Sequence, residues 1–528
     1  MGLAKILVTD NISQFGIDLL SKDHQVDIRL GLSHDELRDI VSEYSGLVVR
    51  SETKITEDII NAGSKLRVIA RAGIGVDNID VSAATNVGIA VVNAPTGNII
   101  AAAEHTIALI LASARNIPQA YLSMKDGKWN RSTFMGSELR GKTLGIIGIG
   151  RVGSEVAKRA RSFDMEIIAY DPFVSGDYAT RIGITLQTLE ELLSKSDFIS
   201  IHTPLTESTE SLLGPRQFSL MKNGCRLINV ARGELIDDTA LFDALSSGKV
   251  SVAALDVFRN EPDIDNRFTD NCNIILTPHL GGATIEAQDA VAIEAVEQLI
   301  NILQGSFGKN VVNAPMLGPD NQVIVSPMIP VAEMMGKLAI GLSEGQFRSV
   351  TLSYEGEIAE YDTSVLKSAF LSGFMQGTTS EQVNSINAPI LAKSRGLELI
   401  EQKQQLDNEF SSLITVILNT SNGQLLISGT FVRGQVHLVR FNEYWLDIAL
   451  TDPTLLFVDN DDRPGSIGAV GTVAGKHNVN INFMEVGRID LRGRAMMVLG
   501  VDDYVPVAML DDMRELLQIH SVKLVRIT

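Results

Sequence analysis

Three short segments carry polar residues that could act together in catalysis, and each follows an apolar run. They contain Arg232 (in 228–234), Glu261 (in 254–262) and His279 (in 277–282). An arginine can hold a carboxylate through two parallel hydrogen bonds. A histidine exchanges a proton near neutral pH, and a glutamate on its far nitrogen fixes its tautomer. Together these groups suit hydride removal from a 2-hydroxy acid, in which one group holds the carboxylate and another accepts the hydroxyl proton.

A glycine-rich turn precedes these segments and predicts a dinucleotide site. The apolar run 144–148 leads into Gly-x-Gly-x-x-Gly and then into a helical pattern over 154–162. In such a turn the first glycine permits the bend, the second lets a pyrophosphate approach the backbone, and the third lets helix and strand pack closely. A carboxylate at the end of the next strand would bond the ribose hydroxyls and repel a 2′-phosphate, which favours NAD over NADP. The predicted cofactor-binding residues here are Gly148, Gly150, Arg151, Val152, Gly153 and Asp171. Arg151 could contact the pyrophosphate, or it could be a solvated loop cation.

The elements that must position these residues alternate between short apolar strands and helices. Such alternation predicts parallel sheets with helices on both faces, in two Rossmann-like doubly wound domains. The predicted strands of the first domain are 5–9, 46–50, 68–71 and 90–92, and those of the second are 144–148, 166–171, 198–202, 226–230, 252–256 and 274–277. The predicted helices include 35–44, 99–114, which Asn98 could cap, and 287–304.

Beyond the breaker-rich linker 313–319 the pattern changes. Strands and helices mix up to about residue 450, which indicates an α+β domain. The last segment predicts a ferredoxin-like βαββαβ module, with strands 454–459, 481–488, 495–501 and 522–527 and helices 466–477 and 507–519.

Length and composition set outer limits on the function. The chain has 528 residues, which suggests about three or four domains. Its net charge of −19 disfavours binding to nucleic acid. Two cysteines exclude a disulfide framework, and neither a signal peptide nor a long uninterrupted apolar stretch is evident. We therefore expect a soluble, cytoplasmic protein that has no metal site and binds no membrane.

Several separate blocks resemble the D-isomer-specific 2-hydroxyacid dehydrogenase family over about residues 1–310. They are residues 49–51, 71–78, 93–98 and 202–205, the glycine-rich turn and the three catalytic segments. The family's Arg, Glu and His fall on Arg232, Glu261 and His279. The resemblance further implies Thr203, Ala231, Asp256 and the backbone near Gly282 beside the nicotinamide.

The resemblance also implies a discontinuous layout. A substrate-binding domain would comprise residues 1–98 and 285–312, with an NAD-binding domain of residues 99–284 inserted between them. An intervening regulatory domain would cover 313–452, and a C-terminal domain 453–528.

Within the family, residues 128–131 and 255–258 resemble members that oxidise 3-phosphoglycerate in L-serine biosynthesis. Arg50 and Arg71 would bind the substrate phosphate, and Asn98 is counted with these substrate-binding residues. Arg131 would reach the site from a neighbouring subunit, because the family dimerises through that region. The apolar helix 99–111 suggests such an interface, so we expect a homo-oligomer, a dimer or a tetramer.

The C-terminal module resembles an ACT domain, which is a small-ligand regulatory module. The positions that hold an amino-acid effector at a domain–domain interface fall on Asn460, Asp462 and Asn480, and L-serine is the expected effector. The alternative is that Asp462 only caps the helix and that Asn480 only closes a turn. The intervening domain of such long members can bind an anionic effector or substrate, but no residues can be assigned to that role.

Two rival functions remain open at this stage. One is a dehydrogenase of an unphosphorylated acid such as glycerate or lactate, although most such relatives end near residue 320. The other is a nucleotide-sensing scaffold similar to the corepressors that share this fold and bind short peptides.

Overall fold

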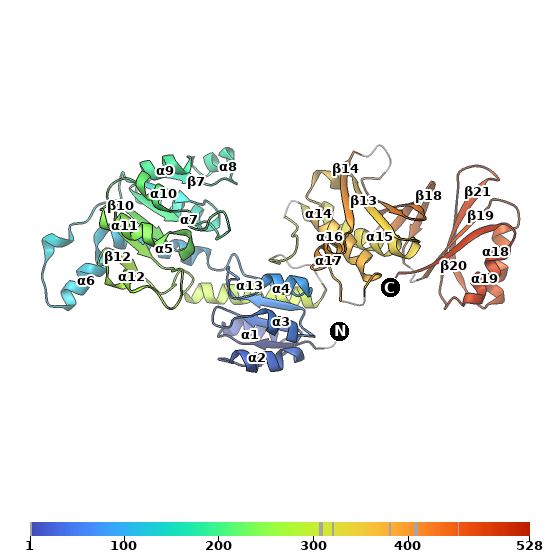
Figure 1. Ribbon diagram of the computed structural model, residues 1–528, viewed down its shortest axis with the longest axis horizontal. Coiled ribbons are helices and arrows are strands. Elements are labelled where there is room, and N and C mark those ends of the chain that lie inside the picture. Colours follow the sequence, from blue (N-terminus) through green and yellow to red (C-terminus); the bar gives the residue numbers. More distant parts are fainter. Residues whose placement is uncertain are drawn as a thin grey trace.

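The computed structural model describes residues 3–305, 310–318, 321–379, 382–405, 410–451 and 454–527. The elongated molecule contains four sheets, with the ACT-like module at one end and the C-terminus on the side of that module that faces the preceding domain (Figure 1). Pro319 of the predicted linker lies outside the described residues.

The first sheet contains five parallel strands in the order β2-β1-β3-β4-β5. Apolar side chains bury the inner strands on both faces, as expected of a parallel sheet covered by helices. Helix α13 returns from the far side of the second domain and packs on this sheet beside α1. The strands are β1 (Lys5–Val8), β2 (Gln25–Ile28), β3 (Gly46–Val49), β4 (Val68–Arg71) and β5 (Ala90–Val92), and the helices are α1 (Gln14–Leu20), α2 (His34–Ile40), α3 (Glu57–Ala62), α4 (Val81–Asn86) and α13 (Ile285–Leu303).

The second sheet contains seven parallel strands in the order β12-β11-β10-β9-β6-β7-β8. Its strands are β6 (Thr143–Ile147), β7 (Glu166–Tyr170), β8 (Thr185–Leu186), β9 (Phe198–Ile201), β10 (Cys225–Asn229), β11 (Val250–Leu255) and β12 (Ile274–Leu276). Its helices are α5 (Ile99–Arg115), α6 (Ile117–Lys125), α7 (Arg151–Arg161), α8 (Gly176–Arg181), α9 (Leu189–Lys195), α10 (Pro215–Leu220), α11 (Asp238–Ser246) and α12 (Asn266–Asp270). The two doubly wound domains predicted from the strand–helix alternation are confirmed.

Helix α5 differs from its prediction in two ways. Asn98 occupies its N-cap position, but the Asn98 side chain makes no capping hydrogen bond. The apolar residues of α5 are mostly buried against α7, β10 and β11 inside their own domain, so they are not available as a subunit interface.

The third sheet has the order β14-β13-β15-β16-β17-β18 and mixes one parallel pair, β13 with β14, with antiparallel pairs. The stretch 322–342 is long and apolar enough to span a membrane by length and composition alone. Half of that stretch is buried in the core of this domain, as expected of a core helix. The elements are α14 (Gln322–Val325), α15 (Ile329–Leu342), β13 (Phe347–Gly356), α16 (Ser364–Gln376), α17 (Ala388–Ser394), β14 (Glu398–Gln404), β15 (Ser412–Thr420), β16 (Gly423–Val432), β17 (Gln435–Phe441) and β18 (Tyr444–Ala449).

The last sheet, β20-β21-β19-β22, is antiparallel and confirms the predicted βαββαβ module. One face packs on its own two helices, and the other face shares a core with the third domain. The second helix ends at Arg514 rather than at the predicted Ile519, because Ile519 begins the last strand. The elements are β19 (Thr454–Asp461), α18 (Ser466–Lys476), β20 (Ile481–Arg488), β21 (Arg494–Val501), α19 (Val507–Arg514) and β22 (Ile519–Arg526).

Candidate active site

The predicted acid/base pair lies on two neighbouring strand-end loops of the second sheet. Glu261 Oε2 lies 2.7 Å from His279 Nδ1, and Glu261 Oε1 accepts a 2.8 Å hydrogen bond from the Phe258 backbone N–H. The bond at Nδ1 leaves Nε2 of His279 as the ring nitrogen for substrate. Burial raises the pKa of Glu261, but the bonds from His279 and Phe258 and the charge of Arg232 outweigh it and hold that pKa below its usual value. The glutamate is therefore ionised and can orient the imidazole.

Three guanidinium groups meet where the first sheet faces this pair. Arg71 ends β4, and its enclosed Nε has no hydrogen-bond partner among the described residues. Burial and the nearby charges of Arg232 and Arg50, partly offset by Asp77, lower the pKa of Arg71 to about 10. Arg232 Nη2 contacts Asp77 Oδ2 at 3.2 Å across the cleft between the two domains. The three guanidinium groups outnumber the carboxylates near Arg71. This excess of positive charge favours binding of an anion.

Two polar residues shape the loop that carries Arg50. Asp10 Oδ2, at the end of β1, accepts the backbone N–H of Arg50 at 2.6 Å and that of Thr53 at 3.2 Å. Asn78 donates to the carbonyl oxygens of Arg50 and Thr53 at 2.8 and 2.6 Å. The loop is therefore fixed by the residues around it.

The glycine-rich turn has the geometry that a pyrophosphate site needs. Gly148 has φ of 91°, so the bend requires glycine. A Cβ at Gly150 would meet nothing within 4 Å, whereas one at Gly153 would collide with the Gly148 carbonyl. Open space at the second glycine and close packing at the third fit a phosphate group at the N-terminus of α7.

Asp171 lies beside this turn. Its Oδ2 accepts the Ile149 N–H at 3.0 Å, and its Oδ1 accepts the Phe173 N–H at 3.0 Å. Each oxygen keeps further acceptor capacity for ribose hydroxyls. Arg151 donates instead to the Pro95 carbonyl at 3.3 Å, which ties the turn to the segment that crosses between the domains. Val152 is partly buried against the core of the second domain.

The residues expected around the nicotinamide surround the same strand ends. The Asn229 Oδ1 accepts the Ala231 N–H at 3.0 Å, and the Thr203 backbone passes beside Gly148. A Cβ at Gly282 would lie 3.0 Å from Asn98 Nδ2, so the structure places Asn98 beside Gly282.

Asp256, the other residue expected there, is fully buried. Burial raises its pKa, but hydrogen bonds from His105 and Thr277 outweigh this effect and keep the pKa below its usual value. Among the described residues, no group of three or more His, Cys, Asp or Glu side chains is placed to hold a metal ion.

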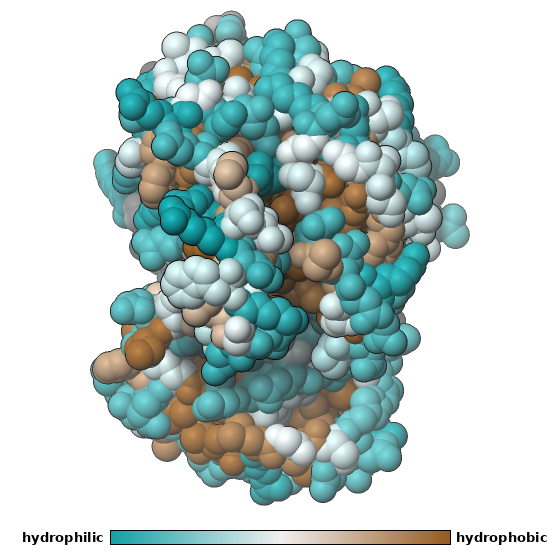
Figure 2. All heavy atoms as spheres, turned by 90° about the vertical axis from the view of Figure 1, so that its left-hand side faces the viewer, coloured by the Kyte–Doolittle hydropathy of each residue, from teal (hydrophilic) through white to brown (hydrophobic). Residues whose placement is uncertain are grey.

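Arg131 is not brought to this cleft within one chain. It lies in the exposed arm that follows α6, on a concavity of about 930 Å³ lined by residues 129–138 and Arg115. Several apolar side chains of α6 and of the arm are exposed, including Leu122 of α6 at 62% and Trp129 of the arm at 79%. Figure 2 looks onto the end of the molecule that carries α6 and shows apolar side chains gathered in hollows between hydrophilic ones.

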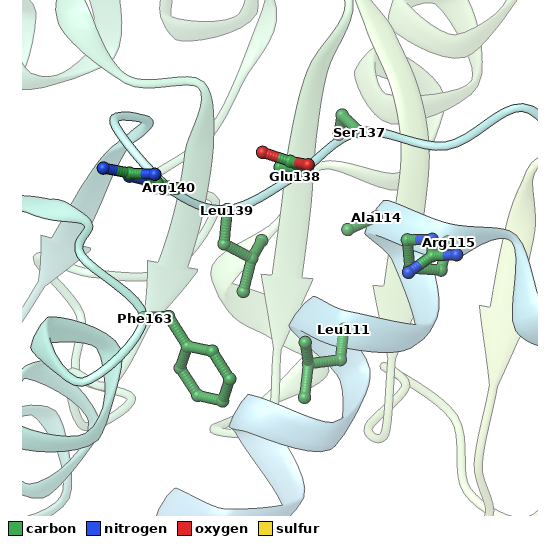
Figure 3. Close-up of a pocket in the computed structure, with 8 residues that line it drawn as sticks. All are labelled: Leu111, Ala114, Arg115, Ser137, Glu138, Leu139, Arg140 and Phe163. Atoms are coloured by element: carbon green, nitrogen blue, oxygen red, sulfur yellow. The ribbon is translucent and has the colours of Figure 1, made fainter.

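A smaller cavity of about 250 Å³ lies at the base of the arm. Leu111 of α5, Leu139 of the returning chain and Phe163 converge on it, as Figure 3 shows. The arm therefore leaves an apolar concave surface uncovered in one chain.

The three predicted effector residues do not meet within one chain either. Asn460 is buried and only 1% exposed. Asp462 lines a cavity of about 590 Å³ with Arg488 and Arg492, and its Oδ2 accepts the Arg492 N–H at 3.2 Å. Asn480 instead bonds Asp502 at 2.6 Å at the opposite end of β20.

The strand register separates these residues further. Asn460 and Arg488 both face Ala495, whereas β20 begins where β21 ends. Asp462 bonds Gly493 and Asn480 bonds Asp502, so at the usual rise per strand residue Asn480 lies roughly 30 Å from Asp462 along the sheet.

Sequence reasoning assigned no role to Asp10, Asp77, His105 or Asn229, although three of them were detectable. Asp10 and Asn229 are polar residues at or just after the end of a buried apolar strand, and His105 interrupts an apolar helix. These are positions where a polar side chain needs a partner.

Three protein families match successive parts of the chain. The NAD binding domain of the D-isomer specific 2-hydroxyacid dehydrogenases matches residues 107–281, the D-3-phosphoglycerate dehydrogenase intervening domain matches 324–442, and the ACT domain matches 454–518.

Curated relatives match nearly the whole chain. The D-3-phosphoglycerate dehydrogenase of Synechocystis sp. is 42% identical over 99% of this chain and 95% of its own length. Those of Methanocaldococcus jannaschii and Bacillus subtilis are 39% and 38% identical, each over 99% of this chain and 100% and 99% of their own lengths.

Solved structures match the first part of the chain. The apo-structure of D-lactate dehydrogenase from Escherichia coli has a TM-score of 0.53 and 28% identity, and covers 58% of this chain and 99% of its own. D-lactate dehydrogenase from Aquifex aeolicus, complexed with NAD and lactic acid, has the same TM-score and identity over 59% of this chain and 99% of its own.

Proposed function

The chain belongs to the D-3-phosphoglycerate dehydrogenases, NAD-dependent D-2-hydroxyacid dehydrogenases of serine biosynthesis that carry intervening and ACT regulatory domains, and from this premise we propose how its residues act. The reaction is oxidation of 3-phosphoglycerate to 3-phosphooxypyruvate. The observation that carries the proposal is the meeting of Arg50, Arg71 and Arg232 beside the Glu261–His279 pair. A substrate with both a carboxylate and a phosphate matches that excess of positive charge.

In the proposed reaction Arg232 holds the substrate carboxylate, and Arg50 and Arg71 hold the phosphate. His279 Nε2 accepts the proton of the C2 hydroxyl. Glu261, bonded to Nδ1, keeps the imidazole in the required tautomer and stabilises the imidazolium that forms. The His279 side chain is 52% exposed here, so further closure of the cleft between the two domains, which Arg232 and Asp77 already bridge, would be needed to shield these groups from water.

NAD fits the second domain of this chain. Gly148, Gly150 and Gly153 with the N-terminus of α7 would hold its pyrophosphate, and Asp171 its ribose. Thr203, Ala231, Asp256 and the Gly282 backbone would flank the nicotinamide, with Asn98 and Arg151 at the rim of the site. When bound, NAD supplies the acceptor for the hydride.

The proposal includes the assembly and the division into domains. The arm after α6 would meet its counterpart in a second copy, so that Arg131 reaches the neighbouring subunit's phosphate site in a dimer or a tetramer. This use of the arm replaces the interface first expected along α5, whose apolar face is buried. The domain limits 1–98 with 285–312, 99–284, 313–452 and 453–528 belong to the same proposal, as does location in the cytoplasm.

L-serine is the proposed effector of the ACT domain. Asp462 would pair with its ammonium group, and Asn460 and Asn480 would contribute at an interface between two copies. The buried Asn460 Oδ1 has no hydrogen-bond partner among the described residues, which leaves it able to accept a bond there.

Turnover of a small substrate panel tests the proposal. NADH formation is measured with 3-phosphoglycerate, D-glycerate and D-lactate, with and without millimolar L-serine. We expect turnover of the phosphorylated acid and inhibition by serine. Turnover of D-glycerate or D-lactate alone would overturn the substrate assignment, and NAD binding without any turnover would favour the scaffold function.

Arg50→Gln tests the phosphate assignment, with Arg38→Gln on the exposed face of α2 as the matched control. Loss of one charged hydrogen bond should raise KM for 3-phosphoglycerate about 10- to 100-fold and leave turnover of D-glycerate nearly unchanged. An equal loss with both substrates would show that Arg50 does not bind the phosphate.

A further inference from the structure

His105 lies on α5 and reaches the strand ends that carry the catalytic loop. Its Nε2 lies 3.2 Å from Asp256 Oδ1 and 3.1 Å from Thr277 Oγ1. Thr277 Oγ1 donates to the same carboxylate oxygen at 2.6 Å. Because Asp256 is ionised, Nε2 of His105 carries the proton and donates to this pair.

The Asp256 carboxylate in turn holds the backbone that follows His279. Its Oδ1 accepts the Leu280 N–H and its Oδ2 accepts the Gly281 N–H, each at 2.8 Å. The His279 N–H bonds the Asp256 carbonyl at 2.9 Å. His279 itself has φ of 54°, a left-handed conformation that the surroundings must impose on a residue other than glycine.

These contacts form one chain of hydrogen bonds from α5 to the catalytic histidine. The chain runs from His105 through Asp256 to the turn 279–281. It also spans 151 positions of sequence, because His105 lies soon after the crossover at Asn98 and Asp256 directly follows β11. The helix that begins at this crossover is thereby tied to the turn that carries the acid/base group.

We propose that His105 is a positioning residue for the reaction: its Nε2–H fixes the Asp256 carboxylate, which holds the turn that places His279. The inference rests on the proposed function of His279. His105 touches neither substrate nor the reacting atoms in this arrangement, and acts through Asp256. Without its N–H the carboxylate loses a donor inside the protein, and the left-handed turn loses part of its support.

Two variants of His105 and one neighbour test this role. His105→Leu removes the donor and keeps the bulk, whereas His105→Gln places an amide N–H near the position of Nε2. Thr106→Val is the matched control, because the hydroxyl of the buried Thr106 bonds the Ala102 carbonyl of its own helix and, among the described residues, no other partner. For each, kcat and KM for 3-phosphoglycerate, the affinity for NAD, and the rate with substrate deuterated at C2 are measured.

We expect kcat of His105→Leu to fall about 10- to 100-fold, since small displacements of a catalytic group have effects of this size. KM for 3-phosphoglycerate should change less than threefold, because Arg50, Arg71 and Arg232 are untouched. The affinity for NAD should change by about the same small factor. The isotope effect should rise as hydride transfer becomes limiting. His105→Gln should recover most of kcat, and Thr106→Val should keep both kcat and the isotope effect.

The inference is overturned if His105→Leu keeps the wild-type kcat and isotope effect. It is also overturned if Thr106→Val loses as much kcat, or if His105→Gln is no better than His105→Leu, because packing alone would then explain the loss. A different result would overturn the proposed function itself, namely a wild-type protein that does not turn over 3-phosphoglycerate.

Discussion

Glu261 and His279 are joined by one 2.7 Å hydrogen bond, and in the proposed mechanism this bond supports His279 as the acid/base group. Replacing Glu261 with Gln keeps the shape and removes the negative charge that stabilises the imidazolium. We expect kcat to fall about 100-fold or more, with NAD affinity unchanged. Stopped-flow NADH formation measures kcat, and fluorescence titration measures the affinity for NAD. His279→Asn is the reference variant, and a Glu261→Gln enzyme as active as the wild type would contradict the assignment.

In the proposed cofactor site, Asp171 is the residue that would set the choice between NAD and NADP. Its carboxylate bonds the Ile149 N–H and lies where a 2′-phosphate would be repelled. Asp171→Ala should lower kcat/KM for NAD about tenfold and raise that for NADP, because the repulsion disappears with the charge. Steady-state assays with both cofactors give the ratio. Asp164→Ala, which removes an exposed carboxylate just before β7, serves as the control and should leave the ratio unchanged.

At the scale of elements, burial decided which parts of the fold could be predicted. The buried strands 68–71 and 90–92 lie where their apolar runs predict them. Strands β2 and β14 were missed because both are sheet edges with polar, exposed side chains and no apolar run. Helix α19 was predicted five residues too long because apolar periodicity continues into β22.

The sequence also allowed only part of the candidate site to be predicted. Polar types at strand ends pointed to Arg232, Glu261 and His279, and the structure joins the last two directly. His105 could not be assigned, because its partner Asp256 is 151 residues away and only the packing of α5 on the sheet brings them together. A sequence indicates which side chains need partners but not which distant strand supplies them.

His202, which follows β9, leads to a prediction about how stability depends on pH. Burial lowers the pKa of His202 to about 4, and its Nε2 bonds Ser200 Oγ at 2.7 Å. Between about pH 6.5 and 4 the unfolded chain binds a proton that the folded chain does not, so the free energy of unfolding decreases as pH falls. The loss should approach about 3 kcal/mol across that window.

Thermal unfolding is measured from pH 7.5 to 4.5. The Tm that counts is that of the transition which NAD shifts to higher temperature. His202→Gln, which cannot titrate, should show a shallower decrease of Tm than the wild type. Identical pH profiles would mean that the pKa of His202 is the same in the folded and the unfolded protein.

The arm after α6 carries a prediction about assembly. Leu122 is exposed on α6, the helix that precedes the arm with Arg131. Leu122→Glu should dissociate the proposed oligomer, because it places a charge in an apolar contact. Activity should fall with it, since Arg131 would no longer reach the neighbouring site. Light scattering gives the mass, and Phe15→Glu on the exposed face of α1 is the control.

At the scale of the whole molecule, the proposed effector residues of the ACT sheet do not meet within one chain. One face packs on α18 and α19 and the other on the intervening domain, so only the sheet edges and ends remain for a second copy. Asp462 and Asn480 lie at opposite ends of β20. A serine that touches both must therefore bridge two chains, and its binding would couple their arrangement.

Mixing of two variants tests this bridging. Asp462→Ala and Asn480→Ala should each abolish inhibition by L-serine while turnover persists, because each site lacks one partner. In a two-fold pair made of one chain of each kind, one of the two sites receives both intact residues. Random exchange should thus restore about one site in four, and inhibition should return in part after the variants are unfolded and refolded together. If refolded mixtures stay insensitive while a wild-type chain refolded in the same way is inhibited, each chain must hold its effector alone, and the sheet would have to open to let Asn480 approach Asp462.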